Sequence, residues 1–214
     1  QMSITIFAAG RIERINDIPA LISDMKEIAE ERNWKYHIIN DDWDVQPDAV
    51  LTPPVTGKPA AQIEGSSGLR GIILNAATGA EPLSILFDRS GVLTDMFQQL
   101  AWIESNGRNE RLTFCKTQFA DIEKHIEIIE ILDRIKKKYI PNLAVNDEGT
   151  YWETRDRRIL AEKRIALNHY LRHAEKVISS IEFPDGCAKD ADSIAASIEK
   201  ALLKADEDGR LDHP

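Results

Sequence analysis

The 214-residue sequence has only two cysteines and no long uninterrupted apolar run. Two thiols, Cys115 and Cys187, are too few for a disulfide framework. A helix that crosses a bilayer needs about 18 consecutive apolar residues, and no segment approaches that length. The first residues also lack the basic start, apolar stretch and small-residue cleavage site of a secretory signal. We therefore expect a cytoplasmic protein that does not insert into a membrane.

Short motifs for catalysis and cofactor binding are also missing. The chain has no Gly-x-Gly-x-x-Gly, no Walker-type phosphate loop, no Gly-x-Ser-x-Gly nucleophile elbow and no Cys-x-x-Cys pair. The segment 65–68 (GSSG) precedes a predicted strand rather than a helix, so it does not form a phosphate-binding loop at a helix N-terminus. The acidic residues in 41–44 match no calcium loop. The sequence therefore predicts neither a cofactor nor a metal ion.

The charge of the chain is negative and unevenly distributed. Acidic residues outnumber basic ones by 36 to 27, which gives a net charge of −9 and disfavours binding to nucleic acid. The net charge is −7 in residues 1–107, +3 in residues 108–176 and −5 in residues 177–214. Such runs are typical of solvated faces, and they also fit a surface that selects a charged partner.

Apolar periodicity predicts most of the secondary structure. Strand patterns occur at residues 3–9, 35–40, 69–75, 83–87, 92–94, 111–119 and 143–146. Helical patterns occur at residues 18–33, 96–104, 121–139, 154–181 and 193–205. The turn sequence in 88–91 (DRSG) predicts a β-hairpin. The Pro- and Gly-rich stretch 44–68 is predicted as a long irregular segment, either a lid or an arm that wraps the surface.

Two strand–helix–strand segments share one layout and predict the core of the fold. They span about residues 3–43 and 111–152, and each has the size of a βαβ unit. Either a duplication or two independent units in one sheet explains the likeness. Together with the central hairpin they predict a mixed β-sheet, with helices mostly on one face. The fold class is α+β, shading to α/β.

The domain boundary is predicted near residue 153. Residues 2–153 form one sheet domain, and residues 154–214 form a helical extension that packs on this domain or on a partner subunit. The apolar surface of the two C-terminal helices favours self-association.

A candidate site is predicted where the strands of the second βαβ unit end. Ligands of open α/β sheets bind at that edge. Three polar residues follow the first strand or begin the helix: Lys116, Gln118 and His125. Five residues follow the second strand: Asp147, Glu148, Tyr151, Trp152 and Glu153.

This arrangement predicts roles for a catalytic site. His125 beside Asp147 or Glu148 is a candidate general base. Lys116 would stabilise developing negative charge, while Gln118, Glu153 and the rings of Tyr151 and Trp152 would contact a substrate. The same residues also fit an ordinary solvated strand edge, with no catalytic role.

The matching edge of the first unit carries Asp41, Asp42 and Trp43, which are predicted as further binding residues. Two functions remain open from the sequence. The first is an acidic interaction protein without catalytic activity that binds a basic protein partner or itself. The alternative is a hydrolase or transferase that uses the second-unit site for a small-molecule ligand.

Overall fold

The computed structural model describes residues 3–52, 62–76 and 79–179. The chain divides into two units, Ser3–Arg155 and a second unit that contains helix α5 (Arg157–Ser179). Each unit is described by itself. The helix predicted over 193–205 lies outside the described residues.

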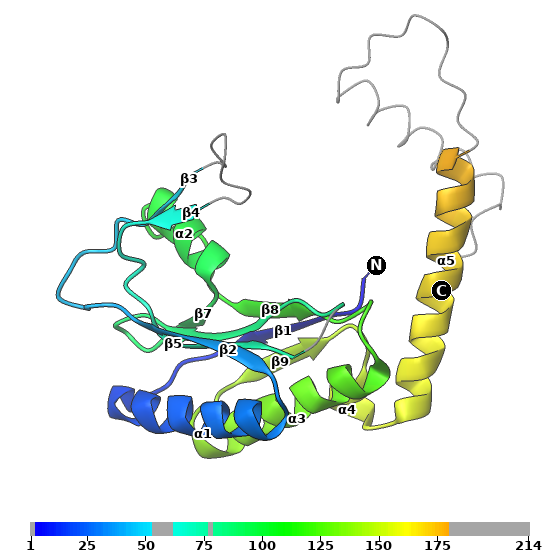
Figure 1. The fold of residues 1–214 in the computed structure, drawn as a ribbon, viewed down its shortest axis with the longest axis horizontal. Helices are drawn as coiled ribbons and strands as arrows, with labels where there is room; N and C mark the ends of the chain where they lie inside the picture. The colour runs from blue at the N-terminus through cyan, green and yellow to red at the C-terminus, as the bar shows by residue number, and fades with distance from the viewer. Residues whose placement is uncertain (1–2, 53–61, 77–78, 180–214) are drawn as a thin grey trace, which may run out of the picture. The chain divides into compact units, whose positions relative to one another are not determined.

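A three-stranded sheet is built around β1 (Thr5–Ala9). This strand lies between β8 (Thr113–Lys116) and β9 (Ala144–Asp147) and runs antiparallel to both. β8 and β9 therefore run parallel to each other, with β1 inserted between them (Figure 1). The first strand of the chain thus pairs with two strands that lie more than a hundred residues later in the sequence.

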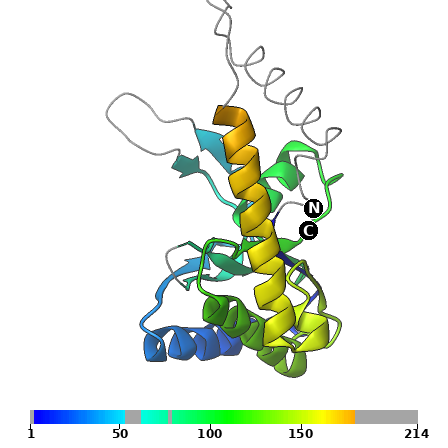
Figure 2. The same cartoon turned by 90° about the vertical axis from the view of Figure 1, so that its right-hand side faces the viewer.

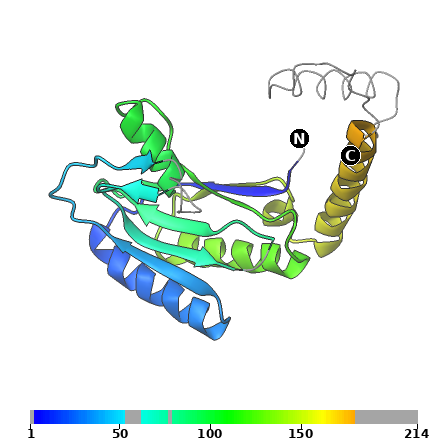
Figure 3. The same cartoon turned by 45° about the horizontal axis from the view of Figure 1, so that its top comes forward.

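A second, four-stranded sheet is antiparallel throughout. Its order is β2-β5-β6-β7, formed by Lys35–Asn40, Arg70–Asn75, Leu83–Phe87 and Leu93–Thr94. The hairpin predicted at residues 88–91 is confirmed, since β6 pairs with β7 across this turn. In Figure 3, β2 lies at the outer margin of these strands.

The two sheets are joined where the end of β1 passes β7. Leu93 N donates to Gly10 O at 3.0 Å, and Ile12 N donates to Gly91 O at 2.9 Å. A side-chain bond also links β8 to β6, since Thr113 Oγ1 donates to the carbonyl of Ser84 at 2.7 Å. The three-stranded and four-stranded sheets therefore form one connected layer.

Helices α1 (Ile18–Glu31) and α3 (Ile122–Lys138) pack beneath this layer. Figures 1 and 2 show them side by side on the same face, whereas α2 (Met96–Glu104) lies on the opposite face. The packing follows from the predicted apolar stripes. Leu21 of α1 and Ile129 of α3 are fully buried in one core cluster with residues of both sheets. An α+β fold results, as the sequence predicts.

The two strands of each predicted βαβ unit are not hydrogen-bonded neighbours in the structure. β1 and β2 belong to different sheets, and β8 and β9 do not pair with each other. The reason is that β1 takes the position between β8 and β9, which local periodicity does not encode.

Part of the stretch predicted as irregular is a β-hairpin. Strands β3 (Val50–Thr52) and β4 (Gln62–Glu64) pair antiparallel. Each strand has only three residues, which is too short for an alternating pattern to stand out in the sequence.

The long helix predicted from residue 154 is interrupted at its start. A four-residue helix, α4 (Tyr151–Thr154), is followed by Arg155, and α5 begins at Arg157. Arg155 adopts a left-handed conformation with φ of 53°, which an α-helix does not accommodate. No glycine or proline marks this break in the sequence.

Gly71 allows β5 and β6 to approach each other closely. A Cβ added at this position would lie 2.1 Å from the carbonyl oxygen of Ile85. We predict that Gly71→Ala lowers the unfolding free energy by at least about 2 kcal/mol, because backbone atoms must move apart. The control is Gly107→Ala, which also has a positive φ but places the nearest atom 3.4 Å away. Equal losses in a urea titration of both variants would contradict this explanation.

Candidate functional site

The ends of β8 and β9 meet the start of β1 at one edge of the three-stranded sheet. Thr5 of β1 lies opposite Lys116, and Ile6 lies opposite Asp147. Helix α3 brings His125 to the same place. The structure therefore brings His125 and Asp147 into direct contact, the pairing that the sequence suggested.

His125 lies inside the protein, in contact with two polar side chains. Its Nε2 is 3.1 Å from Asp147 Oδ2, and its Nδ1 is 2.7 Å from Thr117 Oγ1. Its side chain has 0% relative exposure, and Asp147 has 0% side-chain exposure as well. A ring buried this completely has no open path to a substrate, so the geometry does not resemble an accessible general base.

The hydrogen bonds around His125 can be satisfied in two protonation states. A neutral ring with its proton on Nε2 donates to Asp147 and accepts from the Thr117 hydroxyl. A doubly protonated ring donates to both neighbours, and Thr117 Oγ1 then donates to Ile4 O, 3.3 Å away. In both states the ring links α3 to β9.

Asp147 is held by four interactions that favour its charged form. Burial alone would raise its pKa, but the hydrogen bond and charge of His125 and the N–H groups of Trp152 and Gly149 together lower the pKa below its ordinary value. Gly149 N donates to Oδ1 at 2.7 Å, and Trp152 N donates to Oδ2 at 2.9 Å. This carboxylate therefore fixes the turn after β9.

Glu148 and Lys116 engage different neighbours. Glu148 Oε2 accepts from Ser3 Oγ at 2.7 Å and from Thr5 N at 2.9 Å, which fixes the start of β1. The backbone N–H of Lys116 donates to Glu81 Oε2 at 3.2 Å. Neither residue hydrogen-bonds to His125 in the described contacts, so the predicted catalytic set does not assemble around the ring.

The remaining residues predicted at this edge are spread over the surface and the core margin. Gln118 is buried, whereas Tyr151 and Trp152 are half-buried against the core. The ring of Trp152 lies beneath the Arg155 guanidinium at 4.8 Å. Glu153 is exposed. Both aromatic side chains therefore pack against the core cluster.

The residues predicted at the first edge shape a loop. Asp41 Oδ2 accepts hydrogen bonds from the backbone N–H groups of Ser67 and Gly68 and from the Ser67 hydroxyl. Asp42 is exposed and accepts from the backbone N–H of Asp44 at 3.0 Å. Asp41 therefore has a structural role, while the carboxylate of Asp42 remains open to solvent.

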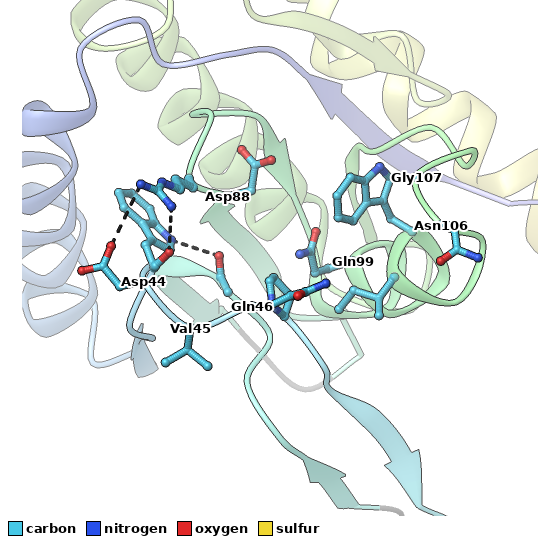
Figure 4. A pocket seen from close by; sticks show the side chains of 13 residues that line it. Asp44, Val45, Gln46, Asp88, Gln99, Asn106 and Gly107 are labelled. Carbon is cyan, nitrogen blue, oxygen red and sulfur yellow. Dashed lines mark hydrogen bonds and ion pairs between the residues drawn. The ribbon is translucent and has the colours of Figure 1, made fainter.

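Trp43 forms part of an open cleft of about 710 Å³. Its indole N–H donates to Gly68 O at 2.9 Å, and Arg70 stacks over its ring at 4.3 Å. The opposite wall comes from α2 and the turn after it, with Trp102 and Asn106. Figure 4 shows Gln99 between Asp44 and Val45 on one side and Asn106 and Gly107 on the other. A cleft of this volume falls in the range of ligand-binding pockets.

Gln99 is a buried polar residue in the wall of this cleft. Its Nε2 donates to Ser67 O at 2.9 Å, which fixes the orientation of the amide. Its Oε1 is buried and has no hydrogen-bond partner among the described residues. The cleft wall therefore contains an acceptor that lacks a donor.

The sequence did not identify Gln99, Trp102 or Asn106 as site residues. They lie within or just after a short helix with an ordinary apolar pattern. Only the tertiary packing of α2 against the 43–47 loop brings them to one cleft, so no local signal was available.

Exposed apolar and acidic side chains occur in the segment that leads from this cleft to β3 and in the paired strand β4. Val45, Val50, Leu51 and Ile63 are between 41% and 56% exposed. The segment 41–52 contains four aspartates and no lysine or arginine. We call the exposed residues Asp42, Asp44, Val45, Val50, Leu51 and Ile63 the hairpin surface.

The described residues contain no group of three or more His, Cys, Asp or Glu side chains that could hold a metal ion. In the same part of the chain, no helix combines the length and hydropathy of a membrane span. Comparison of the chain with protein-family models, with curated proteins and with solved structures found no match.

The buried link between His125 and Asp147 predicts a dependence of stability on pH. Because folding lowers the pKa of Asp147, its contribution is complete above the ordinary value of about 4 and is lost as the pH falls through the lowered pKa. Asp147→Asn should lower the unfolding free energy by about 3 kcal/mol at pH 7. The difference from the wild type should shrink as the pH falls below about 4.

Denaturant titrations across this pH range provide the measurement. Asp121→Asn is the matched control, because Asp121 is exposed and makes no side-chain cap bond. A loss for Asp147→Asn that stays constant with pH, or one no larger than that of the control, would count against the link.

Proposed function

We propose that this chain is an acidic binding protein without catalytic activity, and that its hairpin surface binds a basic protein partner. The observation that carries the proposal is the occurrence of exposed apolar and exposed acidic side chains in one part of the chain, from Asp42 through strand β3 to its partner β4. Leu51 and its cross-strand partner Ile63 are 51% and 41% exposed on one face of the β3–β4 pair. Asp42 and Asp44 are exposed, and Arg89 lies 4.0 Å from the Asp44 carboxylate.

Each component of this surface supports a different aspect of binding. Burial of the exposed valine and leucine side chains supplies affinity. The carboxylates of Asp42 and Asp44 favour a basic partner over an acidic one and accelerate encounter. The surface is therefore suited to a partner that presents apolar residues between lysines or arginines.

The adjacent cleft is suited to an anchoring side chain of that partner. Asp44 and Val45 belong to both the hairpin surface and the cleft wall. A lysine or arginine side chain carries only donors, which complements the exposed carboxylate of Asp44 in the cleft wall. Trp43 and Trp102 supply apolar walls for its methylene groups.

The hydrolase or transferase alternative receives less support. It requires His125 to reach a substrate, whereas the ring is fully buried. A cytoplasmic location remains part of the proposal and comes from the sequence. A small-molecule ligand in the cleft is compatible with the proposed binding function, but no contact of the cleft residues identifies such a ligand.

Binding to a peptide of arginine, leucine and serine tests the charge requirement. Asp42→Asn combined with Asp44→Asn should weaken binding by about tenfold. The matched control is Glu13→Gln combined with Glu27→Gln, which removes two exposed carboxylates elsewhere and should leave the affinity unchanged. Fluorescence anisotropy at two salt concentrations measures both, and salt should weaken the wild-type complex.

A second peptide, with glutamate in place of arginine, completes this test. It should not bind. The proposal is wrong if the acidic peptide binds as tightly as the basic one, or if the control pair loses as much affinity as the hairpin-surface pair.

A further inference from the structure

Strand β2 is the longest edge strand of the sheets formed by the described residues. It occupies one end of the order β2-β5-β6-β7 and spans six residues. It contains no proline, and its one charged side chain, Lys35, lies at its start. Proteins usually protect such an edge with proline, a bulge or inward-pointing charge. β2 has none of these in its interior.

The hydrogen-bond pattern shows which backbone groups point outward. Asp41 N donates to Leu69 O at 3.0 Å, and this pair continues the register in which Asn40 lies opposite Arg70. Inward and outward groups alternate along an antiparallel strand. The N–H and C=O groups of Tyr36, Ile38 and Asn40 therefore point away from β5. Within the described residues, no contact occupies them.

The side chains of β2 also leave apolar surface exposed. Ile38 is 41% exposed, although it lies in the middle of the strand. Tyr36 lies on the same face, where its hydroxyl donates to Glu30 of α1 at 3.0 Å. Alternation places Lys35, His37 and Ile39 on the opposite face, together with Asp41 just after the strand.

We infer that β2 pairs antiparallel with β2 of a second copy of this chain, with the two-fold axis at Ile38. In this register, Ile38 lies opposite Ile38 of the other copy, and Tyr36 lies opposite Asn40 of the other copy. All the outward-pointing backbone N–H and C=O groups of Tyr36, Ile38 and Asn40 are then hydrogen-bonded. About six hydrogen bonds form between the copies. The two sheets then continue into one another.

Charge complementarity selects this partner and register. With the axis at Ile38, Lys35 lies directly opposite Asp41 of the second copy, and the reciprocal pair forms at the other end. Asp41 Oδ2 stays bonded to the Ser67–Gly68 loop of its own copy, so Oδ1 is the oxygen that would accept from the lysine. Opposite charges in facing positions stabilise a strand pair, and like charges destabilise it. The two Ile38 side chains also cover each other. A strand of another protein could form the same backbone hydrogen bonds. It would not place an acidic side chain opposite Lys35 and a lysine opposite Asp41, as the two-fold axis does for a second copy.

The inference is independent of the proposed function, because it uses β2 and not the hairpin surface. Sedimentation equilibrium of the full chain tests it. We expect the wild type to form a dimer at micromolar concentration. Ile38→Lys places two like charges at the axis and should raise the dissociation constant at least about tenfold. The matched control, Ile165→Lys, changes another exposed isoleucine and should leave the dimer intact.

A cross-linking experiment tests the register. Cys187 is replaced by serine, and Cys115 remains as a thiol whose pKa burial, with a smaller effect of Glu81, raises to about 12. In this background Ile38→Cys should form a disulfide-linked dimer, since facing Cα atoms in such a pair lie about 5.5 Å apart. Asn40→Cys should not, because the two positions are separated by four residues, about 13 Å, along the strands.

Each outcome decides the inference. A dimer weakened by Ile38→Lys and cross-linked only through Cys at position 38 supports it. A wild-type monomer at high micromolar concentration, a dimer unaffected by Ile38→Lys, or equal cross-linking at positions 38 and 40 overturns it. The Cys variants keep the test valid even if Ile38→Lys fails to fold.

Discussion

The insertion of β1 between β8 and β9 is the interaction on which the rest of the Ser3–Arg155 unit depends. β1 bonds to β8 on one side and to β9 on the other, and its continuation reaches β7. Segments from the beginning, middle and end of the unit are joined through this one strand. Its position also decides where the polar ends of β8 and β9 lie, because both must align with Thr5 and Ile6.

The buried polar contacts at this edge follow from that arrangement. His125 and Asp147 are fully enclosed, and their ring nitrogens and carboxylate oxygens have partners. An enclosed network of this kind loses stability when one member is removed, and it specifies one arrangement of helix and strand. Its enclosure also separates it from solvent. In the part of the chain that the structure describes, the hairpin surface, its cleft and the edge of β2 are among the surfaces open to other molecules.

The sequence predicted those features that depend on local patterns. Helices α1 and α3 appear within two residues of their predicted ends, because each buries a single apolar stripe. The contact between His125 and Asp147 also followed from the layout of strand, helix and strand. The pairing of β1 could not be predicted, since neighbouring strand positions depend on contacts distant in sequence. The break at Arg155 has no turn residue to signal it.

The same distinction explains which site residues were missed. Trp43 was predicted because it follows a strand, whereas Gln99 and Trp102 lie in a short helix and reach the cleft only through tertiary packing. The exposed apolar side chains of Val50 and Leu51 are also invisible without the structure, because strand residues of that kind are usually buried.

The central claim is that the hairpin surface binds partners while the His125–Asp147 link serves the fold. Backbone amide hydrogen exchange, measured with and without the basic peptide, tests both parts together. The account predicts slower exchange in residues 41–52 on binding and no change in residues 117–125 and 147–152. Slower exchange confined to residues 117–125 and 147–152 would contradict the account.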